Sequence, residues 1–114
     1  MNLDELSEEI SKVSSEKVVQ GLSRFLIEWK DNEETAEELK EGIERYIGNT
    51  WIEKNEVHSK IYRLWSSFRD EAISGIGGMI MNERLYWFGL FNRFDASESE
   101  DEKVLIYRKL HATS

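Results

Sequence analysis

The chain has 114 residues, 39% of them hydrophobic and 33% charged, with a net charge of −8 and neither cysteine nor proline. This length allows one domain with one modest core, and the hydrophobic share excludes a disordered acidic tail. The missing cysteines exclude disulfides, thiolate metal sites and cysteine nucleophiles, and the negative charge disfavours binding to nucleic acids and to anionic membrane surfaces.

Two apolar stripes with helical spacing occupy the first 30 residues. The first predicts a short helix and consists of Leu3, Leu6, Ile10 and Val13. This helix either ends at the serines 14–15 or runs on. The second stripe predicts a longer helix and consists of Val18, Leu22, Phe25, Leu26 and Trp29. Gly21 inside it either weakens the helix or permits a close crossing with a neighbour.

Residues 31–44 form the most acidic part of the chain, with seven carboxylates and one lysine. The apolar residues of this region recur on one face of a helix, and they are Ala36, Leu39, Ile43, Tyr46 and Ile47. The carboxylates fall mainly on the other faces. We expect Asn32 to be the N-cap of this helix and Gly48 to follow its last residue.

Residues 55–72 carry the strongest helical pattern in the chain, and Asn55 is the expected cap. Its apolar positions are Val57, Ile61, Leu64, Trp65, Phe68 and Ala72. Its polar side is basic, with Lys60, Arg63 and Arg69. If this side lies near the acidic helix, it neutralises part of the negative surface.

Residues 74–78, S-G-I-G-G, break that helix. A phosphate-binding loop needs a lysine and a Ser or Thr to open the next helix, and Met79, Ile80 and Met81 stand there instead. We therefore interpret the glycines as an interhelical turn. Asn82 is then expected to cap a helix over residues 83–94.

The segment 83–94 is apolar on nearly every face, through Leu85, Tyr86, Trp87, Phe88, Leu90, Phe91 and Phe94. Such a helix is usually buried, so we favour core packing, with a partner or dimer surface as the alternative. Ser97 and Glu100 match a capping box for a last helix. Residues 103–111 are interpreted as helix in preference to a short strand.

Together these patterns predict an all-α, single-domain bundle of five or six helices over residues 1–114. The predicted core consists of Leu22, Phe25, Leu26, Leu39, Ile43, Ile61, Leu64, Trp65, Phe68, Leu85 and Phe88.

No residue pattern indicates catalysis. His58 and His111 lie far apart and outside any metal-ligand spacing, so both are interpreted as surface or capping residues. The glutamates 34–44 include i, i+3 and i, i+4 pairs, but they lie away from the apolar stripe and no histidine joins them, unlike di-metal bundles. We expect no enzyme, no metal site and no cofactor.

The acidic helix is therefore the predicted functional surface, which attracts and docks a basic protein. The candidate partner-binding residues are Asp31, Glu33, Glu34, Glu37, Glu38, Glu41 and Glu44, with Tyr46 and Trp51 as aromatic anchors. A protein that binds nucleic acid carries a basic cleft, and an acidic helical protein fits such a cleft by imitating phosphate charge.

In size, charge and helicity, and in the stretch E-E-T-A-E-E-L-K-E-G-I-E-R-Y-I at residues 33–47, the chain resembles the small acidic immunity proteins that bacteria make against their own nuclease toxins. The tyrosine pair typical of the helical colicin-DNase immunity proteins is not matched. The resemblance implies a cytoplasmic inhibitor, monomeric or homodimeric, that binds one basic toxin and blocks its active site or an exosite.

The alternative is a structural or regulatory module that associates through Trp87, Phe88 and Phe91. Binding through acidic residues should weaken as ionic strength rises, whereas aromatic association should persist. The acidic N-terminus predicts no secretory signal, and the apolar runs are too short to span a bilayer, so we expect a cytoplasmic protein with no membrane partner.

Overall fold

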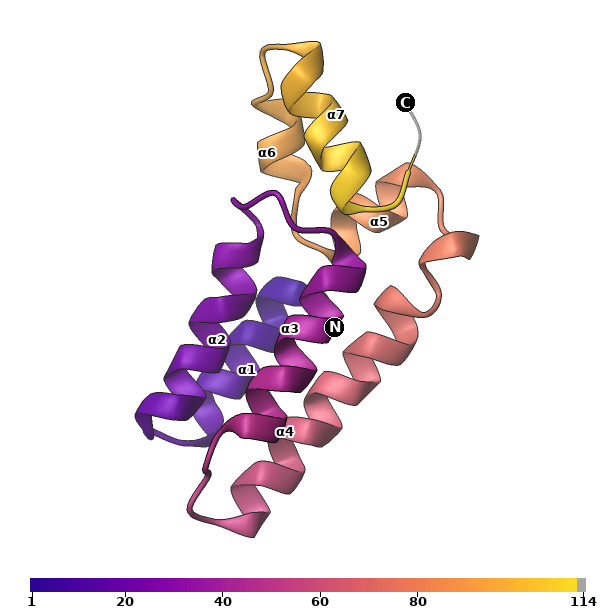
Figure 1. Ribbon diagram of the computed structural model, residues 1–114. Coiled ribbons are helices and arrows are strands. Elements are labelled where there is room, and N and C mark those ends of the chain that lie inside the picture. Colours follow the sequence, from indigo (N-terminus) through magenta and orange to yellow (C-terminus); the bar gives the residue numbers. More distant parts are fainter. Residues whose placement is uncertain (113–114) are drawn as a thin grey trace.

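In the computed structural model, which describes residues 1–112, the chain forms seven α-helices, one π-helical turn and one 3₁₀ turn, with no strand in that range (Figure 1). The predicted all-α class is confirmed, but seven helices exceed the five or six expected. The α-helices are α1 (Leu3–Val13), α2 (Lys17–Trp29), α3 (Ala36–Asn49), α4 (Asn55–Phe68), α5 (Met81–Trp87), α6 (Phe91–Asp95) and α7 (Glu100–Lys109).

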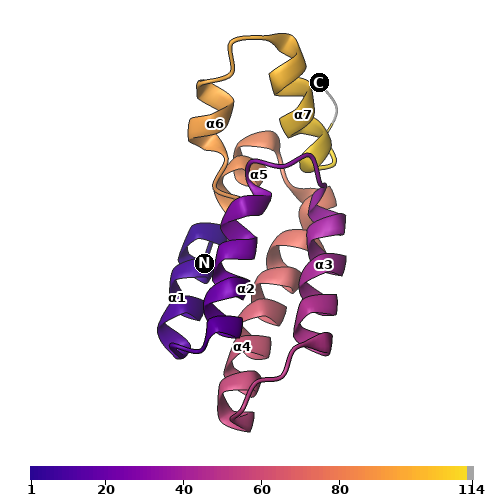
Figure 2. The same ribbon diagram turned by 60° about the vertical axis from the view of Figure 1, so that its left-hand side comes forward.

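The helices are arranged in two layers along a molecule of 45 × 25 × 21 Å. Helices α1 to α4 run alongside one another as a bundle, and α5 to α7 lie over one end of it (Figures 1 and 2). The turn between α2 and α3 is at that same end, so the C-terminal helices meet the start of the acidic helix. Within residues 1–112, no helix has the length and apolarity to cross a membrane.

The acidic helix α3 starts and ends later than predicted. Its N-cap is Thr35 rather than Asn32: the Thr35 hydroxyl accepts a hydrogen bond from the Glu38 backbone N–H, and the Glu38 carboxylate accepts one from the Thr35 N–H. This reciprocal capping box satisfies two donors, which Asn32 alone cannot do. Gly48 lies inside the helix, which continues to Asn49.

Helix α4 begins at Asn55 itself, with Lys54 in the cap position, so the predicted Asn55 cap is one residue late. The helix continues through a π turn, Arg69–Ile73. It ends just before residues 74–78, where the break was predicted. A 3₁₀ turn, Ile76–Gly78, follows.

The aromatic segment forms two helices, α5 and α6, so the single helix predicted over residues 83–94 is wrong. Gly89 separates them with φ +64°, a left-handed conformation that glycine adopts without steric cost. Asn82 is not the cap of α5. The Glu83 carboxylate instead accepts the backbone N–H of Ile80 at 3.1 Å.

Residues 103–109 are helical, as favoured over a strand, but Ser97 and Glu100 do not cap α7. The Ser99 hydroxyl accepts the Glu102 N–H at 3.3 Å and thereby caps α7. The Ser97 hydroxyl is engaged elsewhere, because it donates to the Arg93 carbonyl at the end of α6.

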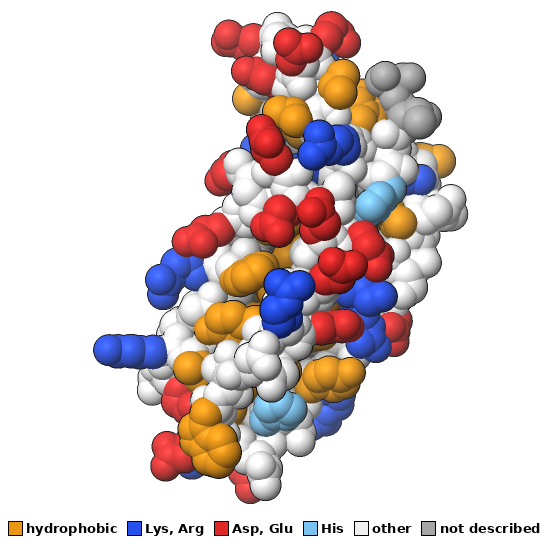
Figure 3. All heavy atoms as spheres, in the orientation of Figure 1, with side chains coloured by type: hydrophobic (Ala, Val, Ile, Leu, Met, Phe, Trp, Pro, Cys, Tyr) orange, Lys and Arg blue, Asp and Glu red, His pale blue; other side chains and the backbone are white. Residues whose placement is uncertain are grey.

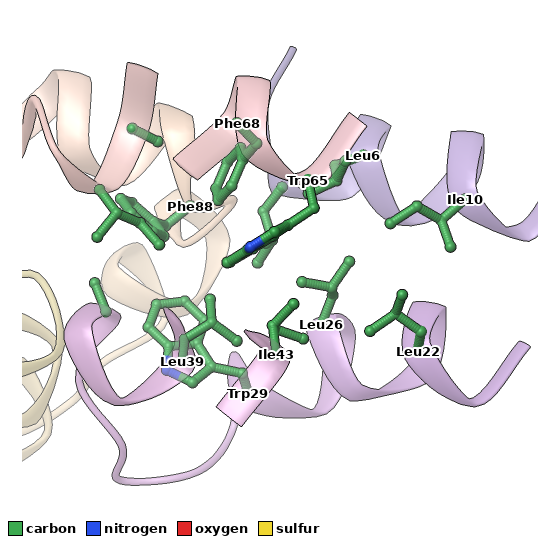
Figure 4. Packing of buried hydrophobic residues seen from close by; sticks show 14 of the residues in the cluster. Leu6, Ile10, Leu22, Leu26, Trp29, Leu39, Ile43, Trp65, Phe68 and Phe88 are labelled. Carbon is green, nitrogen blue, oxygen red and sulfur yellow. The ribbon is translucent and has the colours of Figure 1, made fainter. Parts of the chain in front are cut away.

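The core extends from the bundle into α5 (Figure 4). All predicted core residues are buried except Phe25 and Leu64, which are half-buried against it. The prediction missed a group from α1 and α2, namely Leu3, Leu6, Ile10, Val19 and Trp29. Trp29, Phe88, Phe68 and Trp65 form an aromatic chain with successive ring centroids 5.5, 5.6 and 5.9 Å apart. These four rings join the C-terminal helices to the bundle.

Two glycines let α2 and α3 approach closely, which confirms the crossing proposed for Gly21. A Cβ on Gly21 would lie 2.6 Å from the Tyr46 hydroxyl, and one on Gly42 would lie 2.9 Å from the Phe25 ring. The rings of Phe25 and Tyr46 meet edge to face at 6.1 Å. At this crossing the Tyr46 ring therefore packs on Gly21 and the Phe25 ring packs on Gly42, and these contacts fix the position of α3 against α2.

Candidate functional site

The seven carboxylates of residues 31–44 fall into two groups. All seven except Glu44 are exposed, and we call four of them the acidic face: Glu33, Glu34, Glu37 and Glu41. Figure 3 shows acidic side chains gathered over the N-terminal half of α3. Among residues 1–112, Glu33 and Glu41 form no ion pair or hydrogen bond through their carboxylates, and Glu37 lies only 3.6 Å from Lys40. Glu34 accepts the Asn32 side-chain amide at 2.9 Å.

The remaining three carboxylates are engaged within the protein. Asp31 accepts two hydrogen bonds from Arg93, at 2.5 and 3.0 Å. Hydrogen bonding to Arg93 holds the pKa of Asp31 below its ordinary value. Glu38 completes the capping box, and its hydrogen bond from the Thr35 backbone lowers its pKa.

Glu44 pairs with Arg69, the first residue of the π turn after α4, at 2.9 Å, so the basic side predicted for residues 55–72 does neutralise part of the acidic helix. It does so through one residue. Lys60 and Arg63 line a separate groove with Met1 and form no ion pair with α3 among the described residues.

The turn before α3 is held by Lys109, which sequence reasoning missed. Its ammonium donates to the backbone carbonyls of Trp29, Asn32 and Glu34, at 2.5, 2.6 and 2.9 Å, and approaches the Asn32 side-chain oxygen at 3.0 Å. It also lies 4.1 Å from the centroid of the Trp29 ring, in cation–π range. One buried cation therefore fixes the C-terminal carbonyls of α2 and the path of the acidic turn.

Lys109 is only 3% exposed. Burial lowers the pKa of its ammonium to about 8, against the opposing attraction of Glu34 and Asp31. The group therefore remains mainly protonated at pH 7. The sequence does contain a pattern that indicates burial of this lysine. Lys109 follows Ile106 by three positions and precedes Leu110, so it occupies the apolar side of the last helix, where a hydrophobic residue is expected.

The residues after α7 lie against the start of α3. His111 has a left-handed backbone with φ 55°, and its Nε2 accepts the Glu37 backbone N–H at 3.2 Å. His111 is thus a capping residue, as predicted, but it caps α3 and not its own helix. Arg84 holds this segment by donating to the carbonyls of Leu110 and His111, both at 2.9 Å.

The two predicted aromatic anchors differ in exposure. The Tyr46 hydroxyl donates to the Val18 carbonyl at 2.6 Å, and its ring packs in the α2–α3 crossing, so Tyr46 contributes to the fold. Trp51 is 82% exposed just beyond α3. It follows Glu37 by fourteen positions, roughly 15–20 Å further along the helix direction.

Within residues 1–112, no three His, Asp or Glu side chains converge as metal ligands would. The acidic face presents exposed carboxylates with the charge that electrostatic docking of a basic surface needs, and Trp51 is exposed beyond the last residue of α3. Comparison with known protein families, curated proteins and solved structures gives no significant match.

Proposed function

We propose that the protein is a cytoplasmic, non-enzymatic inhibitor that binds one basic protein, most simply a bacterial nuclease toxin. Its docking surface is the acidic face, and Trp51 adds an aromatic contact. A nuclease needs a basic cleft or surface to hold nucleic-acid phosphates. A rigid row of carboxylates is complementary to such a surface and speeds association by electrostatic steering.

The observation that carries this proposal is the division of the carboxylates into two groups. Asp31 and Glu44 pair with arginines and Glu38 completes a capping box, whereas Glu33 and Glu41 have no partner for their carboxylates within residues 1–112 and Glu37 has only Lys40 of its own helix, at 3.6 Å. Like charges at i, i+4 destabilise a helix by a few tenths of a kcal/mol per pair. A basic partner removes this repulsion, so the uncompensated charge favours the bound state.

The backbone of the acidic face is ordered before any partner arrives. Lys109 holds the turn before α3, and the Thr35–Glu38 capping box begins the helix. The Nε2 of His111 accepts a hydrogen bond from the Glu37 backbone N–H. Binding through this surface requires little ordering of the chain, which is one of the main costs of association.

The test is affinity capture from the native host with three forms of the protein as bait: the natural chain, a face-reversed variant and a charge-matched control. The face-reversed variant carries Glu33→Lys, Glu37→Lys and Glu41→Lys. Glu38 is left unchanged because its reversal would break the capping box. The control carries Glu28→Lys, Glu53→Lys and Asp95→Lys, which are exposed acids without ion pairs among the described residues.

We expect the natural chain and the control to retain one basic protein that the face-reversed variant loses. The retained protein should be a nuclease whose activity falls to zero at one equivalent of the natural chain. Retention of the same protein by all three baits would place its binding site outside the acidic face. A captured protein without toxic or nuclease activity would reject the inhibitor function.

Self-association through the aromatic segment is the second candidate, and two exposed rings support it. Tyr86 is 50% and Phe91 38% exposed, and both line a hollow of about 170 Å³ where α5 and α6 meet the start of α1. Phe88, by contrast, is fully buried, and Trp87 is half-buried. Sedimentation at high salt distinguishes the two functions, because an aromatic dimer persists there and acid-driven binding weakens.

A further inference from the structure

A groove lies between Met1, just before α1, and the exposed side of α4 with the π turn that follows it. It is open to solvent, has a volume of about 400 Å³ and is lined by Met1, Lys60, Arg63, Leu64, Ser67 and Glu71. This volume is in the range of small-molecule sites. Its apolar lining comes from the Met1 side chain and the half-buried Leu64, the cations Lys60 and Arg63 lie in α4, and the one carboxylate, Glu71, lies in the π turn beyond the end of that helix.

The two cations of this groove have no partner within residues 1–112. Lys60 and Arg63 are exposed and form neither an ion pair nor a side-chain hydrogen bond there. Lys30, Arg69 and Arg93, by contrast, each pair with a carboxylate. In a chain of net charge −8, two free cations beside an apolar surface favour an external anion.

We propose that this groove binds an amphipathic carboxylate, a single acidic group on an unbranched apolar chain. The carboxylate pairs with Arg63 and Lys60, since a guanidinium offers two parallel N–H donors to a carboxylate. The apolar chain lies along Leu64 under Met1, whose flexible thioether adapts to the shape of a ligand.

The groove favours an alkyl chain over an acidic peptide. The backbone N–H and C=O groups of α4 are engaged inside the helix, so the wall offers a peptide main chain nothing to pair with. From Arg63 to Glu71 the helix rises by roughly 12 Å. That is about the length of a medium-chain fatty acid.

The test is calorimetric titration of the full chain with decanoate, with methyl decanoate and decyltrimethylammonium as the neutral and cationic probes. We expect one saturable decanoate site and much weaker binding of the other two probes. The variant Lys60→Gln with Arg63→Gln should bind decanoate about tenfold more weakly or worse, because it loses two charge-assisted contacts. The control, Lys17→Gln with Arg24→Gln, removes two exposed cations from α2 and should bind as the natural chain does.

A third variant, Ser67→Trp, fills the groove without changing its charge and should abolish decanoate binding. Circular dichroism of each variant reports whether it is folded, and amide shifts of residues 60–71 locate the ligand. Three results would overturn the proposal: no saturable binding up to about 1 mM, equal binding of decyltrimethylammonium, or unchanged binding by the Lys60/Arg63 variant. Self-association that depends on Lys60 and Arg63 would assign the groove to a second copy and overturn it as well.

Discussion

Lys109 connects α7 to the turn between α2 and α3, which lies 75 to 80 positions earlier in the sequence. It stands in α7, donates to carbonyls at the end of α2 and in the turn before α3, and covers the Trp29 ring. Each of these carbonyls would lose its donor without the ammonium. Hydrogen bonds to charged groups contribute about 1.5–3 kcal/mol each to stability, and the cost of burying the ammonium offsets part of this sum.

Lys109→Met keeps the length of the side chain and removes its charge, so we expect a loss of about 2–4 kcal/mol in the free energy of unfolding. Urea denaturation measures this change. Arg108→Met is the control, because Arg108 is the exposed neighbour on the same helix. Equal stabilities of the two variants would show that Lys109 does not hold the acidic turn.

The Asp31–Arg93 ion pair gives a test based on pH. The pKa of Asp31 is lower in the folded protein than its ordinary value of 3.8. The ion pair therefore stabilises the folded protein fully above pH 3.8, and this stabilisation is lost as the pH falls through the lower pKa of the folded state. Asp31→Asn should therefore cost stability at pH 7, by no more than about 1 kcal/mol because the side chain is largely exposed.

Below pH 3.8 this difference between the natural chain and Asp31→Asn should shrink, because the protonated Asp31 side chain is neutral, as the Asn side chain is at every pH. Thermal melts at a series of pH values measure it, with Asp95→Asn as the exposed control. A difference that stays constant down to the acid limit would contradict the role given to the ion pair.

At the scale of helices, the apolar stripes predict that a helix is present in each region. Competition between neighbouring residues for the capping hydrogen bonds decides where that helix begins and ends. The stripe of α3 was visible, but Thr35 displaced Asn32 as its cap because only Thr35 has a glutamate three residues later that returns a hydrogen bond. The aromatic segment was apolar throughout and gave no periodicity to locate the break at Gly89. That break depends on tertiary packing, which a single sequence does not display.

The α2–α3 crossing yields a matched pair of glycine substitutions. Alanine at Gly48 meets no atom within 4 Å and should stabilise α3 by up to about 1 kcal/mol, the helix-propensity difference. Alanine at Gly42 gains the same propensity but pushes on the Phe25 ring, 2.9 Å from its Cβ. Overpacking costs about 1–3 kcal/mol, so Gly42→Ala should be less stable than Gly48→Ala by that amount.

Chemical denaturation of the two variants measures this difference. If Gly42→Ala is as stable as Gly48→Ala, the Phe25 ring moves freely and the crossing is looser than described.

At the scale of the whole molecule, the sequence showed where negative charge is concentrated but not which charges are free. The seven carboxylates of residues 31–44 look alike in the sequence. Glu38 is engaged by the local capping box with Thr35, but Glu44 and Asp31 are engaged by Arg69 and Arg93, which lie 25 and 62 positions away. Tyr46 was predicted at the interface and instead packs in the α2–α3 crossing, whereas Trp51 is exposed. Long-range contacts of this kind cannot be inferred from local spacing.

The central claim is that the acidic face binds a basic partner, and the most direct test is the dissociation constant of the captured protein, measured by calorimetry at low and high salt. The natural chain and the Glu28/Glu53/Asp95 control should bind alike and weaken as salt rises. The Glu33/Glu37/Glu41 variant should bind about a hundredfold more weakly or worse at low salt. Equal dissociation constants for all three forms, or binding that salt does not change, would contradict the account.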